Sequence, residues 1–190
     1  EPTLLTINYT RSLDLKQEEE LKKYIEKKNL LYIATPFSYA AATWLNNKKI
    51  KIFKVGSGEC NNIPLIKHIS SFGKPMIIST GMNNLNDVKK TLSVLKKNNK
   101  NILLHCVNLY PTKIKDINFK RMFEMMKKFK KSIIGFSDHT TGNNAAKIAI
   151  ANGAWVIEKH FTLNKKDKGP DISCSMDKKE LQELIKFSKD

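Results

Sequence analysis

The sequence of 190 residues predicts an α/β protein built on a parallel sheet, and three observations lead to this prediction. Short apolar runs alternate along the chain with segments of helical pattern, as in repeated βα units. The runs lack the strict alternation of polar and apolar residues that marks a sheet with one solvated face. Hairpin signals do not join neighbouring runs. An open doubly wound sheet and a (β/α)8 barrel both accommodate such units, and counting them does not decide between the two.

The strand predictions rest on short runs of mainly apolar residues, the usual appearance of a strand buried on both faces. In chain order these runs are 31–35, 50–57, 75–80, 101–107, 132–137 and 154–161. Each is preceded or followed by a helical segment, so the chain reads as successive βα units.

Helices are predicted over 15–28, 38–46, 61–70, 86–97, 119–129, 141–151 and 177–189. Asn86 can cap the first turn of the fourth of these segments, and Val88, Leu92 and Leu95 recur on one face of it. Pro64 lies near the start of the third, where the missing N–H of proline is tolerated.

The composition excludes several classes of function. The net charge of +16 at first suggests nucleic acid. However, the positive charge is almost all lysine, with arginine only at Arg11 and Arg121, and readers of nucleic acid favour arginine. We therefore expect no nucleic-acid partner, although the charge would attract an anionic substrate. No apolar run approaches the ~18 residues of a membrane span. Three cysteines without a CxxC pair indicate free thiols and a cytoplasmic location.

Polar residues gather at the end of each predicted strand. They are Thr35; Lys54, Ser57 and Glu59; Ser79 and Thr80; His105 and Asn108; Ser137, Asp138 and His139; and Glu158 and His160. The carboxyl ends of parallel strands open on the same edge of a sheet, which is the usual active-site face of such folds. The sequence therefore predicts one polar site assembled from several strand ends.

His139 and His160 end two successive strands. Adjacent parallel strands lie ~4.8 Å apart, so two imidazoles at equivalent heights could share one divalent metal ion. The residues alone leave open the alternative that the two histidines make unrelated polar contacts.

Lys54 interrupts an apolar strand with a cation. A buried lysine requires an anionic neighbour, either a ligand or a carboxylate. Two interpretations follow, an anion-binding site or a structural bridge to Glu158 or Asp138. Cys106 adjoins His105, but alternate strand residues face opposite sides of a sheet, so we expect Cys106 to be a core thiol rather than a nucleophile.

Six segments together resemble the sialic acid synthase (N-acetylneuraminate synthase) family, including the legionaminic and pseudaminic acid synthases. They are YIATPFS at 32–38, FKVGSGECNNI at 53–63, PMIISTGM at 75–82, LLHCVNLYPT at 103–112, IIGFSDHT at 133–140 and EKHFTLNKKDKGPDISCSM at 158–176. Their order and spacing agree with the family pattern over about residues 13–190.

The resemblance implies a (β/α)8 barrel, with residues 1–190 forming a partial barrel domain from about strand three to strand eight. The family's first two strands and its C-terminal antifreeze-like domain are then absent from this sequence. In the family those parts supply a further phosphate-binding lysine, an acidic group and an arginine from the partner subunit. The resemblance also implies a homodimer when the protein is full-length.

The resemblance further implies a reaction of phosphoenolpyruvate with an N-acetylated amino sugar of the N-acetylmannosamine type, giving a nonulosonic acid and phosphate. His139 and His160 would be metal ligands, for Mn²⁺ or else Mg²⁺ or Co²⁺. The residues expected to hold phosphoenolpyruvate are Lys54, Ser57, Ser79, Asn108 and Ser137. The residues expected to face the sugar are Glu59, Tyr110 and Asp171, with Thr35 near the reacting carbons and Glu59 as the candidate base.

Two alternatives stay open at this point. A different phosphoenolpyruvate- or pyruvate-dependent lyase could use the same barrel, with Lys54 forming a Schiff base. The chain could instead be a non-catalytic barrel fragment, or a partner subunit that needs a companion chain for the missing strands.

Overall fold

The computed structural model describes residues 13–97 and 99–189, and its elements alternate as expected. The helices are α2 (Leu15–Lys27), α3 (Tyr39–Asn47), α4 (Ile63–Ser71), α5 (Leu85–Ser93), α6 (Phe119–Lys128), α7 (Asn144–Ala151) and α8 (Lys178–Phe187). The strands are β1 (Phe53–Val55), β2 (Met76–Ser79), β3 (Asn101–Cys106), β4 (Ile133–Asp138) and β5 (Ile157–Lys159). Three short 3₁₀ turns lie among these elements: η1 (Ser57–Glu59), η2 (Ile114–Asp116) and η3 (Ile172–Cys174).

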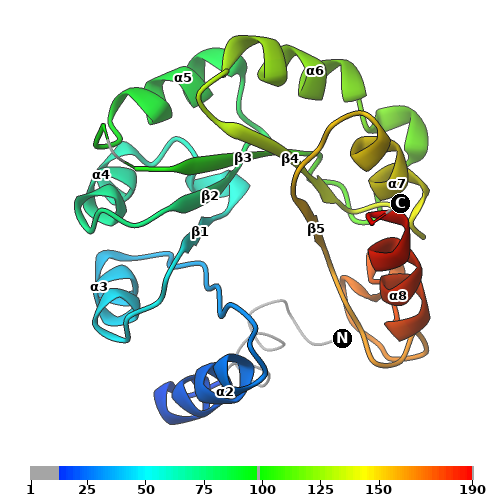
Figure 1. The fold of residues 1–190 in the computed structure, drawn as a ribbon, viewed down its shortest axis with the longest axis horizontal. Helices are drawn as coiled ribbons and strands as arrows, with labels where there is room; N and C mark the ends of the chain where they lie inside the picture. The colour runs from blue at the N-terminus through cyan, green and yellow to red at the C-terminus, as the bar shows by residue number, and fades with distance from the viewer. Residues whose placement is uncertain (1–12, 98, 190) are drawn as a thin grey trace.

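The strands form one parallel sheet in the order β1-β2-β3-β4-β5. The sheet curves into a half-barrel with helices around its outside, and α2 and α8 stand at the two ends of the arc (Figure 1). A (β/α)8 barrel curves in this sense, whereas an open doubly wound sheet carries helices on both faces. The parallel α/β prediction is therefore confirmed, and the curvature favours the barrel.

The predicted strand over 31–35 is wrong as an element. Only one parallel bridge forms there, between Ala34 and Phe53, with Lys54 N donating to the carbonyl of Ala34 at 3.1 Å. Within the described residues no strand pairs with the other side of this segment, so nothing holds it in regular extended form. Leu31 and Ile33 are exposed in consequence.

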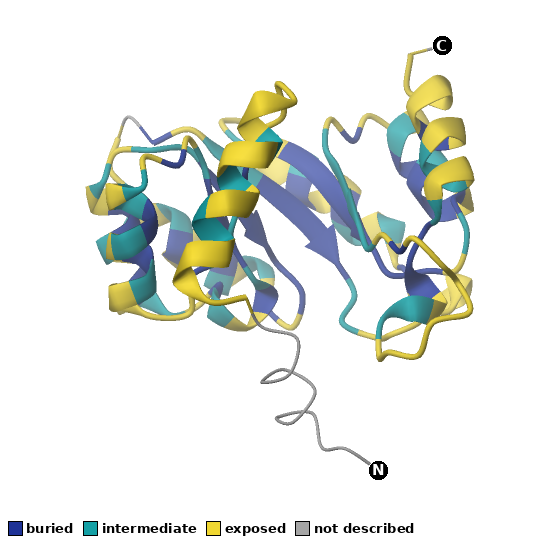
Figure 2. Ribbon diagram, turned by 90° about the horizontal axis from the view of Figure 1, so that it is seen from below, coloured by how far each residue is buried: buried dark blue, intermediate teal, exposed yellow. Residues whose placement is uncertain are grey.

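The main core lies between the sheet and the outer helices. Its largest fully buried members come from both layers and include Phe53, Ile66, Leu103, Met122 and Phe136. Burying such side chains contributes ~1.5–3 kcal/mol each, which holds the helices against the sheet. Strands β1 and β2 and most of β3 and β4 are accordingly dark blue in Figure 2, whereas β5 is of intermediate burial and the outward faces of the helices are largely yellow.

The helix starts agree with the sequence predictions at Pro64 but not at α5, where the N-cap lies two residues earlier than predicted. Asn84, not Asn86, caps α5: its side chain accepts from the backbone N–H groups of Asn86 and Asp87 at 2.8 and 3.0 Å, and Asp87 completes a capping box. The helix therefore begins earlier than predicted. Pro64 lies in the first turn of α4, as expected.

Apolar surface remains uncovered at both ends of the arc. Helix α2 has no buried residue, and Leu15 and Tyr24 on it are exposed. Just before β5, Trp155 is 83% exposed and borders an apolar cavity of about 600 Å³ next to α8. Among the described helices, none combines the length and the apolar character needed to cross a bilayer.

Candidate active site

Lys54 is the centre of a polar cluster inside the arc. Its Nζ donates to Ser79 Oγ at 2.9 Å and to the carbonyl of Val55 at 3.1 Å, and it lies 3.4 Å from Glu158 Oε2. Glu158 Oε1 in turn accepts from Ser137 Oγ at 2.9 Å. These residues come from β1, β2, β4 and β5. Side chains of the first and the last strand meet because the sheet curves; in a flat sheet of this order the two strands would lie ~19 Å apart.

The structural bridge named as an alternative for Lys54 is therefore present toward Glu158. It does not form toward Asp138, which pairs with Lys159 instead. The two carboxylates differ in exposure: the Glu158 side chain is 41% exposed and that of Asp138 is 0% exposed. Glu158 can thus be reached from solvent at the mouth of the arc, where an anion could take its place beside Lys54.

Gly81 brings two further predicted residues to this cluster. A Cβ at this position would lie 1.8 Å from Asn108 Oδ1 and 2.9 Å from Ser57 Oγ, so only glycine allows both side chains to approach. The N–H of Gly81 donates to Ser57 Oγ at 3.1 Å, and Asn83 Nδ2 donates to the carbonyl of Ser57 at 2.9 Å. We call Lys54, Ser57, Ser79, Asn108 and Ser137 the polar corner.

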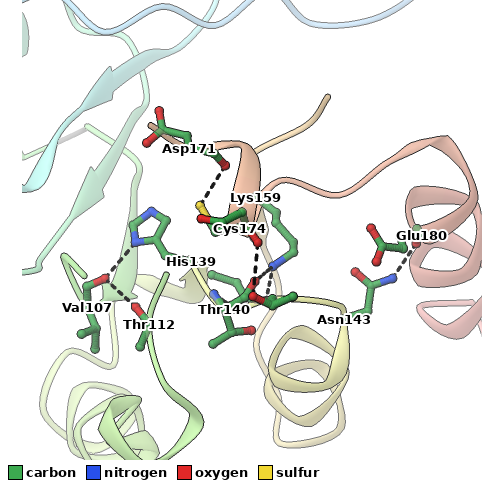
Figure 3. A network of polar contacts seen from close by, with 12 residues as sticks. Val107, Thr112, His139, Thr140, Asn143, Lys159, Asp171, Cys174 and Glu180 are labelled. Carbon is green, nitrogen blue, oxygen red and sulfur yellow. Dashed lines mark hydrogen bonds and ion pairs between the residues drawn. The ribbon is translucent and has the colours of Figure 1, made fainter. Parts of the chain in front are cut away.

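His139 and His160 lie side by side at the ends of β4 and β5, with ring centroids 5.4 Å apart. His139 Nδ1 lies 2.8 Å from the carbonyl of Val107, as Figure 3 shows. A carbonyl can only accept, so Nδ1 carries the proton and Nε2 keeps a free lone pair. Burial lowers the pKa of His139 below its usual value, which favours the neutral ring.

This arrangement fits a divalent cation. A metal-binding histidine is usually neutral and oriented by a hydrogen bond from its other nitrogen to a carbonyl or carboxylate, as His139 is. Beside His160, Asp171 Oδ2 lies 3.8 Å from Nδ1. Within the described part of the chain, no group of three or more His, Cys, Asp and Glu side chains is arranged to hold a metal. Two imidazoles are thus the ligands that His139 and His160 would contribute to a cation.

Tyr110 completes the histidine side of the site. Its ring lies against both imidazoles, with centroids 4.1 Å from His139 and 5.7 Å from His160. Burial raises the pKa of its hydroxyl to about 12, so Tyr110 is a neutral hydrogen-bonding group. Tyr110 and Asp171 thus lie where a ligand between the histidines would meet them.

Cys106 lies between the polar corner and the histidines. Its Sγ is 3.5 Å from Asn108 Oδ1 and 3.9 Å from His139 Nδ1. His105 faces the opposite side, with Nε2 2.7 Å from the carbonyl of Ile117, so the expected alternation holds. Cys106 is buried as predicted, but it lies in the wall of the site rather than in the core. Burial raises the pKa of its thiol, and a protonated thiol is a weak nucleophile.

The contacts of two other predicted residues lie outside this arrangement. Glu59 follows β1 on η1, and its Oε2 accepts from Asn62 Nδ2 at 2.6 Å. Thr35 lines a cavity of about 500 Å³ between α2 and α3, together with Trp44. Sequence reasoning gave no role in the site to Gly81, Asn83 and Cys106, which the structure brings to it. It named Glu158 only as a strand-end residue and as a possible bridge partner of Lys54, and that bridge is present.

The geometry is that of an α/β half-barrel with a polar corner around a buried lysine, beside a pair of histidines. Residues 2–190 match the family model described as the NeuB family, and the chain belongs to this family. The match confirms the resemblance that the six sequence segments indicated.

Known relatives agree with this assignment. The chain is 43% identical over 176 residues to the N,N'-diacetyllegionaminic acid synthase of Campylobacter jejuni, covering 90% of this chain and 52% of that protein. It is 36% identical over 171 residues to the N-acetylneuraminate-9-phosphate synthase of Homo sapiens, covering 90% and 48%. The crystal structure of the N-acetylneuraminic acid (sialic acid) synthetase of Leptospira borgpetersenii, in complex with citrate, superposes with a TM-score of 0.89 at 32% identity, covering 94% of this chain and 62% of that one. The chain thus spans about half the length of the curated relatives it matches.

Proposed function

We propose that this protein is a nonulosonic acid synthase that condenses phosphoenolpyruvate with an N-acetylated amino sugar of the N-acetylmannosamine type. The observation that carries the proposal is a buried, hydroxyl-lined lysine placed beside two adjacent imidazoles at one mouth of the half-barrel. Family membership supports it, since relatives carry the names of legionaminic, pseudaminic and N-acetylneuraminate-9-phosphate synthases.

The polar corner is the proposed binding site of phosphoenolpyruvate. The ammonium of Lys54 and the hydroxyl and amide groups around it offer donors to a phosphate and a carboxylate. Binding there takes the lysine away from Glu158, which is exposed enough to be hydrated when released. The corner would hold the C3 carbon of phosphoenolpyruvate toward the histidines, so that two bound reactants meet in a fixed orientation.

The histidine pair is the proposed metal site. His139 and His160 would hold Mn²⁺, or else Mg²⁺ or Co²⁺, and the bound cation would supply Lewis-acid polarisation of the sugar's aldehyde oxygen. Tyr110 and Asp171 lie beside the two rings and are the proposed contacts of the sugar, together with Glu59 and Thr35 from the neighbouring loops.

The proposed reaction forms a bond between C3 of phosphoenolpyruvate and the aldehyde carbon of the open-chain sugar. Water then adds at C2, and the resulting tetrahedral centre collapses with loss of phosphate, leaving the 2-keto acid. The aldehyde oxygen takes up one proton as it becomes a hydroxyl, and the water that adds at C2 gives up one to a base, for which Glu59 is the candidate.

The proposal also covers the position of this chain in the barrel, the oligomeric state and the cellular compartment. We assign the bridge segment around Ala34 and the strands β1 to β5 to strands three to eight of an eight-stranded barrel, so that residues 1–190 are a partial barrel domain. The full-length protein is proposed to be a cytoplasmic homodimer. Three cysteines that form no disulfide suit that compartment.

The test is phosphate release from phosphoenolpyruvate by the full-length gene product, with N-acetylmannosamine and Mn²⁺ supplied. Release should require all three components, and mass spectrometry should find the corresponding 2-keto acid. No release with N-acetylmannosamine or with its bacterial analogues would overturn the proposal. Trapping of pyruvate on Lys54 by borohydride would identify the competing Schiff-base lyase instead.

A second candidate is a non-catalytic partner subunit, favoured by the uncovered apolar surface at both ends of the arc. A reading frame about twice as long as this chain, as in the relatives, would favour the complete enzyme. A frame that ends with this chain, together with isolation in a stable complex with a second barrel fragment, would favour the subunit.

A further inference from the structure

A buried ion pair lies directly behind the two histidines. Lys159 Nζ is 2.9 Å from Asp138 Oδ2, and the two side chains are 1% and 0% exposed. Successive side chains of a strand face opposite sides of the sheet. Ser137 and Glu158 face the interior of the arc, so Asp138 and Lys159 face the helix layer, where Lys159 borders the cavity beside α8.

The pair links the residues before and after His139, because Asp138 precedes the histidine and both charged side chains hydrogen-bond to Thr140, which follows it. Asp138 Oδ1 accepts from the N–H of Thr140 at 2.8 Å, and Lys159 Nζ donates to the carbonyl of Thr140 at 2.7 Å. Figure 3 shows Lys159 reaching across to Thr140 beside His139. The backbone preceding and following the histidine is therefore fixed by one charged unit. The carbonyl of His139 itself accepts from the N–H of Thr112 at 2.8 Å.

The pair also fixes the register of β4 against β5. Asp138 is paired with Lys159 in the sheet, and the residue that follows on each strand is a histidine. A slip of one residue would turn the side chains of one strand to the other face. His160 would then point to the helix layer, away from His139. A specific bond between the two preceding residues opposes such a slip.

Stability alone does not account for this pair. Removing two charges from water is costly, and replacing a buried ion pair by apolar residues of similar size is often neutral or stabilising. What such a replacement cannot reproduce is the directional hold on Thr140 and on the strand register. We propose that Asp138 and Lys159 are positioning residues that hold His139 and His160 at the spacing a divalent cation requires; this rests on the proposed metal site.

The test compares the wild-type full-length protein with the double variant D138L/K159M, which removes both charges and leaves neither unpaired. The control is K165M/E180Q, which removes a partly exposed pair with a separation of 2.5 Å. Mn²⁺ affinity is measured by electron paramagnetic resonance of the free ion. Hydrogen exchange is measured at the amides of Thr112 and Met176, which donate to the carbonyls of His139 and His160 at 2.8 Å.

We expect the double variant to fold, with a native circular dichroism spectrum, and to bind Mn²⁺ about 10- to 100-fold more weakly, the usual effect of losing the groups that orient a metal ligand. Exchange at Thr112 and Met176 should become faster, while affinity for phosphoenolpyruvate and the behaviour of the control should be unchanged. K159R, which keeps the cation, should retain most of the Mn²⁺ affinity. This rescue would not be expected if the pair merely filled space.

Unchanged Mn²⁺ affinity and unchanged exchange in the folded double variant would overturn the positioning role. If D138L/K159M does not fold, D138A/K159M, which also removes both polar groups but adds no bulk at position 138, replaces it with the same expectations. Absence of Mn²⁺ binding by the wild-type protein would instead refute the metal site. The exchange measurement, made without metal, would still decide whether the pair holds the two histidine segments.

Discussion

Replacing Lys54 by Met in the full-length protein removes one cation while filling nearly the same space. Lys54 contacts Ser79 Oγ at 2.9 Å and Glu158 at 3.4 Å, and the carboxylate is 41% exposed. Because released Glu158 can be hydrated and the methionine fills most of the space, the main loss is the hydrogen bonds of the ammonium, and we expect the free energy of unfolding to fall by no more than about 2 kcal/mol. If the polar corner binds phosphoenolpyruvate, the loss of a charge-assisted contact should cost roughly 1.5–3 kcal/mol of binding, or about 10- to 150-fold in affinity.

Isothermal titration calorimetry of the folded variant with phosphoenolpyruvate measures this loss, and titration with the amino sugar should show a much smaller one. K51M is the matched control, because Lys51 is an exposed lysine on the segment leading into β1. A dissociation constant for phosphoenolpyruvate equal to that of the wild type, combined with a large loss of stability, would show that Lys54 is only a structural bridge to Glu158.

Three other substitutions test separate parts of the structure. Replacing His139 or His160 by Ala in the full-length protein should abolish metal dependence and most activity if the two residues form the proposed metal site; wild-type turnover at limiting Mn²⁺ would refute the two-histidine assignment. G81A should weaken phosphoenolpyruvate binding by about tenfold or more, since its Cβ would lie 1.8 Å from Asn108 Oδ1. G58A, whose Cβ would meet nothing within 4 Å, is the control, and equal affinities of the two variants would contradict the explanation. M122A, at a fully buried position, should lower the free energy of unfolding by about 2–5 kcal/mol in urea titrations, and a loss below 0.5 kcal/mol would argue against the packing of α6.

The parallel architecture could be predicted because it depends on local pattern. Buried strands and amphipathic helices leave periodic signals in the sequence, and five of the six predicted strands form. The segment 31–35 has the same apolar pattern, but a strand also needs partners, and among the described residues this segment forms a single bridge, between Ala34 and Phe53. Propensity alone therefore predicted an element that the tertiary contacts do not complete.

The sequence predicts which residues gather at the site better than it predicts which of them contact one another. Strand-end polarity placed Lys54, Ser79 and the two histidines on one mouth without any structure. The role of Glu158 depends on curvature, because it meets Lys54 only when the first and last strands of the sheet turn toward each other. Alternation along β3 placed Cys106 opposite His105, but which of the two faces the site also depends on how the sheet curves.

The Lys54–Glu158 contact joins residues that are far apart in the sequence and belong to the outermost strands of the sheet. Every unit between them must pack correctly before the two side chains can touch. The distance between Lys54 and Glu158 therefore depends on the curvature of the whole sheet. A substitution in a distant helix that flattens the arc slightly would separate Lys54 from Glu158 first, so damage to the corner can arise from mutations that lie nowhere near it.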